Sequence, residues 1–171
     1  MKVIVINGKP TSGKSTFVKL AKELYQSTYE LSMVDLVKLI AKDFGWDEVK
    51  DEKGRRLLAD IKATACRYNP NIIYEDIDTS LRYYANSCYY AGCDPIFFIN
   101  ARNPADINYL VKKYNAVSLF IDNPNVPMVE SNPEDKGVEN YRYDVTIVND
   151  GTMDELKAKA EKFLEELNHD Y

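Results

Sequence analysis

Val3-Ile4-Val5-Ile6 and, one residue later, Gly8-Lys9-Pro10-Thr11-Ser12-Gly13-Lys14-Ser15 are the two stretches that decide the fold. The second matches G-x-x-x-x-G-K-[ST], and a helical pattern of apolar residues begins near its last residue. An apolar strand, a glycine loop and a helix, in this order, form a cradle of backbone N–H groups that binds phosphate. We therefore expect a nucleoside triphosphate to bind at Gly8, Lys9, Pro10, Thr11, Ser12, Gly13, Lys14, Ser15 and Thr16.

The side chains of this loop have separate expected roles. Lys14 carries a positive charge that can reach the terminal phosphates, and the Ser15 hydroxyl can ligate Mg²⁺. Gly8 and Gly13 can adopt backbone conformations that a Cβ atom would penalise. ATP and Mg²⁺ are therefore the expected cofactors.

The composition is typical of one soluble globular domain. The 171 residues are 45% hydrophobic and 29% charged, which allows a sizeable core. We find no signal peptide and no apolar run near the ~20 residues of a membrane span, so we expect a cytoplasmic protein without a membrane partner. The net charge of −5 argues against a nucleic-acid partner, because such surfaces are usually basic. The three cysteines and the single histidine lack the spacing of zinc ligands, which favours reduced thiols.

Apolar runs and helical periodicities alternate along the chain. Strands are expected at residues 3–6, 29–33, 96–99, 117–121 and 145–148, and helices at residues 15–25, 34–44, 55–67, 73–91, 104–114 and 152–167. This alternation predicts an α/β fold with three α/β/α layers and a five-stranded parallel sheet. Together with the phosphate loop, it resembles the P-loop NTPase fold of the nucleotide-kinase-like type. Residues 1–171 would form a single domain, with a possible acceptor-binding helical segment at 34–92 and a lid-like loop at 122–143.

Several charged residues could hold a second, phosphorylated molecule. Arg102 follows the strand at 96–99, so we expect it at the carboxyl edge of the sheet, where ligands bind in open α/β folds. Arg55 and Arg56 begin a helix, where the helix dipole disfavours arginine, so they indicate either a functional site or a solvated helix end. Asp35 and Lys38 could line an acceptor pocket, although Asp35 is also a suitable first-turn acid.

One expected residue is not where phosphate-loop enzymes usually place it. In such enzymes a strand beside the loop ends in Asp or Glu, which supports Mg²⁺. Here the strand at 96–99 is followed by Asn100. Asp122 follows the strand at 117–121, but the pattern leaves open whether that strand lies beside the loop.

Three segments of the chain resemble the P-loop nucleoside monophosphate kinase group, which includes phage-type deoxynucleoside monophosphate kinases and adenylate-kinase-like enzymes. They are the loop at 8–15, the arginine-led Gly54-Arg55-Arg56-Leu57-Leu58, and the closing segment at 143–152 with Glu155-Leu156. The family often has Asp-x-Arg where this chain has Asn100-Ala101-Arg102. Arginines are also expected in the lid, and the cations between residues 122 and 144 are Lys136 and Arg142.

The resemblance implies an ATP-dependent phosphotransferase acting on a nucleoside or deoxynucleoside monophosphate, a small-molecule partner. Lys14, Arg102 and Arg142 would be catalytic, and Ser15 would hold the metal. Asp35, Lys38, Arg55 and Arg56 would bind the acceptor. Two alternatives remain open: a nucleotide-binding regulatory module without turnover, or a kinase of a non-nucleotide acceptor such as dephospho-coenzyme A. The oligomeric state is not predicted.

Overall fold

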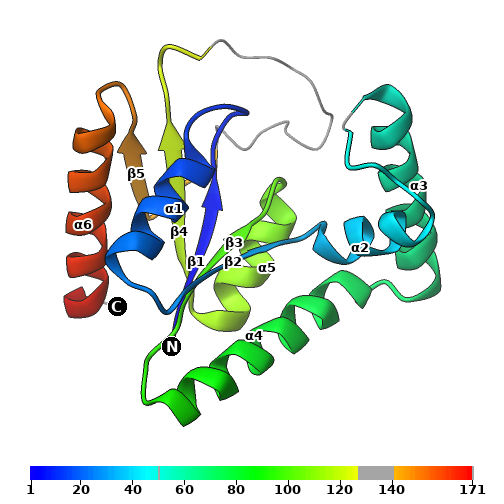
Figure 1. Cartoon of the computed structure of the whole chain (residues 1–171), viewed down its shortest axis with the longest axis horizontal. Helices are drawn as coiled ribbons and strands as arrows, with labels where there is room; N and C mark the ends of the chain where they lie inside the picture. Colours follow the sequence, from blue (N-terminus) through cyan, green and yellow to red (C-terminus); the bar gives the residue numbers. More distant parts are fainter. Residues whose placement is uncertain (50, 127–140, 171) are drawn as a thin grey trace.

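The computed structural model describes residues 1–49, 51–126 and 141–170, which form five parallel strands and six helices (Figure 1). In chain order the elements are β1 (Lys2–Asn7), α1 (Lys14–Leu24), β2 (Thr28–Ser32), α2 (Asp35–Asp43), α3 (Glu52–Tyr68), α4 (Ile72–Ala91), β3 (Ile96–Asn100), α5 (Pro104–Tyr114), β4 (Val117–Asp122), β5 (Val145–Val148) and α6 (Met153–Asp170). The predicted α/β fold with a five-stranded parallel sheet is confirmed.

The strands lie in the order β2-β3-β1-β4-β5, with β1 in the centre. Ile6 of β1 lies opposite Asn100 of β3 on one side and Leu119 of β4 on the other. The strand that ends in Asp122 is therefore a direct neighbour of β1, which answers the question that the sequence left open. All carboxyl ends meet at one edge of the sheet, where β1 leads into the phosphate loop.

Both faces of the sheet are buried, which explains why β1 is apolar at successive positions. Ile4 and Ile6 face α1 and α6, where Phe17 of α1 packs edge-on against Phe98 and Phe163 with ring centroids 6.2 and 5.9 Å away. The alternate residues of the strand pack in a second core with α4 and α5. Figure 1 shows α2 and α3 together beyond the β2 edge of the sheet.

Helix α3 begins earlier than its expected start at residue 55. Asp51 caps it, because its Oδ1 accepts a hydrogen bond of 2.7 Å from the backbone N–H of Gly54. Arg55 is the fourth residue of the helix, at the end of a first turn that also carries an acid, Glu52. The predicted helix start at residue 55 was wrong, because the helix already begins at Glu52.

Two sequence-based expectations concern regions outside these elements. Residues 127–140 of the predicted lid, including Lys136, lie outside the described residues. Of the helices that the structure describes, none is long and apolar enough to cross a membrane.

Candidate active site

The phosphate loop joins β1 to α1 and depends on two glycines with unusual backbone angles. Gly8 has φ +150° and Gly13 has φ +100°. A Cβ atom on Gly8 would lie 2.3 Å from the carbonyl oxygen of Ile121, and one on Gly13 would lie 2.3 Å from Nδ2 of Asn149. Both positions therefore require glycine for conformation and for space.

Lys14 lies across this loop. Its Nζ donates hydrogen bonds of 2.6 and 2.7 Å to the carbonyl oxygens of Gly8 and Lys9. These bonds hold the ammonium group at the mouth of the loop, where a phosphate oxygen would attract it more strongly than a neutral carbonyl does.

Asn149, directly after β5, supports the loop from the far end of the chain. Its Nδ2 donates a 2.8 Å hydrogen bond to the carbonyl oxygen of Ser12. Its backbone N–H donates one of 2.6 Å to the backbone carbonyl oxygen of Asp122. Sequence reasoning used the segment at 143–152 for the family resemblance and missed this contact. The signal was an asparagine at a strand end, but only the strand order shows that it reaches the loop.

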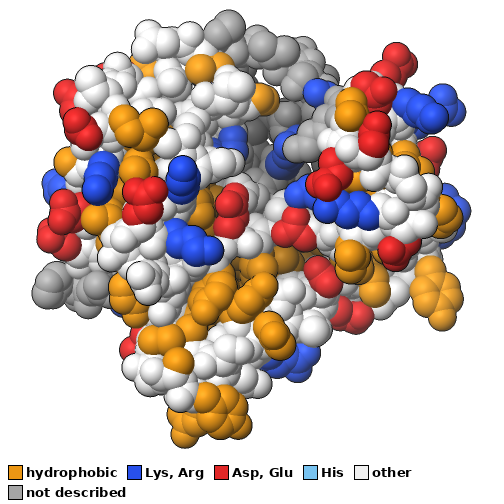
Figure 2. Space-filling view, in the orientation of Figure 1, with side chains coloured by type: hydrophobic (Ala, Val, Ile, Leu, Met, Phe, Trp, Pro, Cys, Tyr) orange, Lys and Arg blue, Asp and Glu red, His pale blue; other side chains and the backbone are white. Residues whose placement is uncertain are grey.

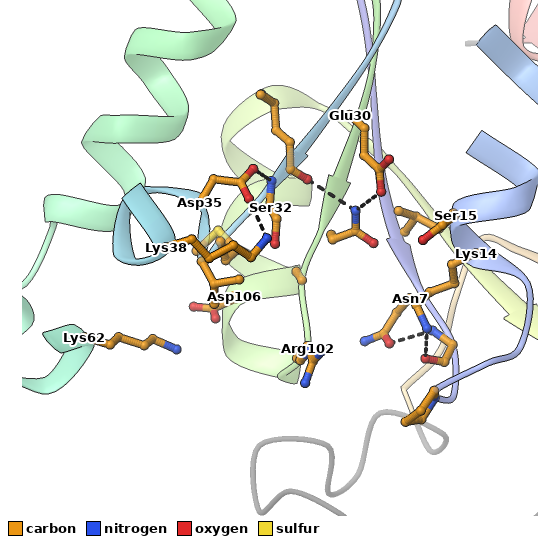
Figure 3. A pocket seen from close by; sticks show the side chains of 18 of the residues that line it. Asn7, Lys14, Ser15, Glu30, Ser32, Asp35, Lys38, Lys62, Arg102 and Asp106 are labelled. Atoms are coloured by element: carbon orange, nitrogen blue, oxygen red, sulfur yellow. Dashed lines mark hydrogen bonds and ion pairs between the residues drawn. The ribbon is translucent and has the colours of Figure 1, made fainter. Parts of the chain in front are cut away.

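A cavity of about 560 Å³ opens at the carboxyl ends of β1, β2 and β3. The loop lies on one side, and residues of α2, α3 and α5 lie on the other (Figure 3). Figure 2 shows the surface hollowed between the body of the sheet and α3, with Lys or Arg side chains around the hollow. The charged residues that line the cavity are Lys14, Glu30, Asp35, Lys38, Lys62, Arg102 and Asp106.

The structure brings together many of the predicted site residues in this cavity. Those among its lining are Gly8, Pro10, Thr11, Lys14, Ser15, Asp35, Lys38 and Arg102. The predicted residues that are not among the described lining are Lys9, Ser12, Gly13, Thr16, Arg55, Arg56 and Arg142. From α3 the cavity receives Lys62, which is two turns beyond Arg55 and was not predicted.

Asp35 and Lys38 form one unit at the start of α2. Asp35 accepts a 2.8 Å hydrogen bond from the backbone N–H of Ser32. It also forms an ion pair with Lys38, whose Nζ donates a 2.8 Å hydrogen bond to it. Asp35 is therefore both a first-turn acid and part of the cavity wall, so the two interpretations of this residue are compatible.

Asp106, at the start of α5, is a lining carboxylate that sequence reasoning missed. Tyr74 Oη donates to one of its oxygens at 2.6 Å, and Asn103 Nδ2 donates to the other at 2.5 Å. Burial, followed by the hydrogen bond to Asp106, raises the pKa of Tyr74, so the phenol remains a donor at neutral pH. The Asp106 carboxylate is thus fixed in orientation by neutral donors.

Asn7, the last residue of β1, presents a buried amide to the cavity. It is 5% exposed, and its Oδ1 accepts a 2.6 Å hydrogen bond from Gly8 N–H. Its Nδ2 has no hydrogen-bond partner among the described residues. The Tyr143 hydroxyl is also buried. Burial raises the pKa of Tyr143, and an interaction with the Asn7 side chain lowers it, so these two buried polar groups interact with each other.

The carboxyl end of β3 carries Asn100, whose Nδ2 donates to Glu30 Oε1 at 2.8 Å and to the Leu31 carbonyl at 3.4 Å. Within residues 1–49, 51–126 and 141–170, no group of three or more His, Cys, Asp or Glu could hold a metal ion by itself. Mg²⁺ commonly uses one or two protein oxygens together with substrate phosphates and water. The Ser15 hydroxyl and the Glu30 carboxylate, which line the same cavity, fit that requirement.

The comparisons with known proteins agree with this fold. No protein-family model and no curated protein sequence matches the chain. Shikimate kinase from Acinetobacter baumannii, in complex with shikimate, is 12% identical with a TM-score of 0.51, over 100% of this chain and 96% of that one. Shikimate kinase from Aquifex aeolicus is 12% identical with a TM-score of 0.50, over 98% of both chains. At this identity the likeness establishes that the chain shares the fold of these two structures.

Proposed function

We propose that the protein is an ATP-dependent phosphotransferase acting on a small phosphorylated acceptor, with a nucleoside or deoxynucleoside monophosphate as the preferred one. One observation carries the proposal: a single cavity joins the phosphate loop to three cationic side chains, Lys38, Lys62 and Arg102. These come from α2, α3 and the segment after β3. Two phosphorylated molecules could therefore meet with their charges neutralised from both sides.

The expected chemistry is mainly positioning and electrostatics. ATP would place its phosphates on the loop, and Lys14 would follow the transferred phosphoryl group. Arg102 would stabilise the charge that spreads over that group, because it lines the same cavity as Lys14. The acceptor phosphate is already a competent nucleophile, so holding it in line supplies much of the rate. Bound Mg²⁺ would neutralise phosphate charge, and Ser15 would hold it.

The other predicted cations would have to approach the cavity to take part. Arg142 is exposed and follows residues 127–140, while Arg55 and Arg56 are exposed on α3. They remain proposed contacts of the acceptor or of the transferred phosphoryl group. We also propose a cytoplasmic enzyme with small-molecule substrates.

A nucleotide-binding module without turnover is the second candidate. The observation that favours it is Asn100, an amide at the strand end where an acid is usual. A kinase of dephospho-coenzyme A would use the same donor half of the cavity with a different acceptor.

An assay of ADP release against a panel of acceptors separates these candidates. The panel contains nucleoside monophosphates, deoxynucleoside monophosphates and dephospho-coenzyme A. We expect ADP only when a nucleoside or deoxynucleoside monophosphate is present, and Lys14→Ala should lower kcat by at least ~10²–10³-fold. ATP binding without acceptor-dependent ADP would favour the regulatory module. Near-normal turnover by Lys14→Ala would contradict the proposed donor site.

A further inference from the structure

Glu30 and Asn100 lie on the same face of the sheet. Glu30 of β2 pairs with Phe98 of β3, and Asn100 lies two residues beyond Phe98. Because strand side chains alternate between faces, both residues share the face of Phe98. That face packs against α1, since Phe98 lies in one core with Phe17.

Ser15 is in the first turn of α1, on that same side of the sheet. It lines the cavity together with Glu30 and Asn100. In Figure 3 the Glu30 carboxylate is drawn toward Ser15, at the loop end of the cavity. The loop hydroxyl and a carboxylate from β2 are therefore present at one end of the cavity.

We propose that Glu30 is the carboxylate that supports the Mg²⁺ of the bound nucleotide, and that Asn100 is a positioning residue that holds it there. This inference rests on the proposed ATP site. An amide at the end of β3 cannot supply negative charge itself, but its Nδ2 donates to Glu30 at 2.8 Å. The negative charge usually carried by this strand end would thus come from the neighbouring strand. Mg²⁺ retains several waters in such sites, so Glu30 can act through them.

The other acids near the loop are engaged differently. Asp122, at the end of β4, lies 3.8 Å from Lys9 Nζ and is not among the described residues that line the cavity. Asp35 is paired with Lys38 at 2.8 Å. Asp106, at the start of α5, accepts hydrogen bonds from the phenol of Tyr74 and the side-chain amide of Asn103. Glu30 and Asp106 both line the cavity and both accept hydrogen bonds from neutral donors. Asp106 lies at the start of α5, whereas Glu30 lies on the face of the sheet that packs against α1, the helix that carries Ser15.

Moving the charge between the two strands provides the test. The dissociation constant of a non-hydrolysable ATP analogue is measured by calorimetry with and without Mg²⁺. The value without Mg²⁺ divided by the value with Mg²⁺ reports how much the metal strengthens binding. Glu30→Gln should reduce that ratio by about 10–100-fold, with little change in Mg²⁺-free affinity. Asn100→Ala should lower it in the same direction but less. Adding Asn100→Asp to Glu30→Gln should restore most of it, because the acid then lies at the end of β3.

Asp122→Asn is the matched control, since it removes the same charge from the strand on the other side of β1. It should leave the ratio within about twofold of the unmodified protein. Glu30 is exposed, so Glu30→Gln should unfold at a similar denaturant concentration. A Glu30→Gln ratio equal to that of the unmodified protein, or a loss confined to Asp122→Asn, would overturn the inference while leaving the ATP site intact. Failure of the unmodified protein to bind the analogue would instead refute the proposed function.

Discussion

At the scale of single residues, the shape of the phosphate loop depends on contacts from distant parts of the chain. Asn149 donates to the carbonyl oxygen of Ser12, which lies 137 positions earlier. Gly8 lies against the backbone of Ile121, and Gly13 lies against the Asn149 side chain. The loop motif therefore predicts a phosphate site, and β4 and the segment after β5 hold the loop in position.

The Asn149 contact can be tested by removing its amide. Asn149→Ala should lower the free energy of unfolding by about 0.5–1.5 kcal/mol, because one hydrogen bond is lost. It should also weaken binding of an ATP analogue, since the Ser12 carbonyl loses its support. Urea unfolding and calorimetry give the two values. Asn86→Ala, at an exposed site on α4, is the control. Equal effects of the two substitutions would contradict the supporting role of Asn149.

At the scale of elements, a cluster of ionisable side chains joins α4 to α5. Asp78 of α4 accepts hydrogen bonds from Lys113 Nζ and Tyr114 Oη of α5. Lys113 also lies 5.4 Å from the ring centroids of Tyr109 and Tyr114. Burial alone would raise the pKa of Asp78, but the hydrogen bonds from Lys113 and Tyr114 outweigh it, so that pKa is lowered.

This lowered pKa predicts a pH-dependent contribution to stability. A carboxylate with a lower pKa in the folded state stabilises the protein above its unfolded pKa of about 3.9, and that contribution is lost as pH falls through the folded value. Asp78→Asn should therefore lower the free energy of unfolding by about 1–3 kcal/mol at pH 7. The difference from the unmodified protein should shrink below about pH 4.

Denaturant unfolding across this pH range checks the expectation. Asp60→Asn, which changes an exposed acid on α3, should show a much smaller effect at pH 7. A difference between Asp78→Asn and the unmodified protein that grows as pH falls would contradict the assignment.

The helix boundaries show where periodicity alone was insufficient. The apolar spacing placed the start of α3 at residue 55, but the helix begins at Glu52 because Asp51 caps it. A charged cap carries no apolar signal, so the apolar spacing did not extend the helix to it. The same shift places Arg55 at the end of the first turn of the helix rather than at its first position.

At the scale of the whole molecule, the fold could be predicted because each element carries a local signal. The strands β1, β3 and β4 are apolar on both faces, and the glycine loop marks the turn between β1 and α1. The order of strands carries no such local signal. Whether Asp122 lies beside the loop could therefore not be predicted.

The same limitation explains the site residues that were missed. The contacts of Glu30 and Asn149 could not be predicted without the strand order β2-β3-β1-β4-β5, because these contacts join segments that are distant in the sequence. Lys62 and Asp106 line the cavity because α3 and α5 converge on it. Arg102 could be placed from sequence, since it follows a strand whose carboxyl end faces the cavity. Local pattern thus placed the loop side of the cavity better than the side formed by α2, α3 and α5.

The central claim is that this cavity transfers a phosphoryl group from ATP to a phosphorylated acceptor. Phosphorus NMR of the protein with ATP, Mg²⁺ and a nucleoside monophosphate tests it most directly, because it follows donor and acceptor together. The account predicts that the γ-phosphate signal of ATP disappears while ADP and a new phosphoanhydride signal of the acceptor appear. Unchanged ATP with every monophosphate in the panel, or conversion of its γ-phosphate to inorganic phosphate without an acceptor, would contradict it.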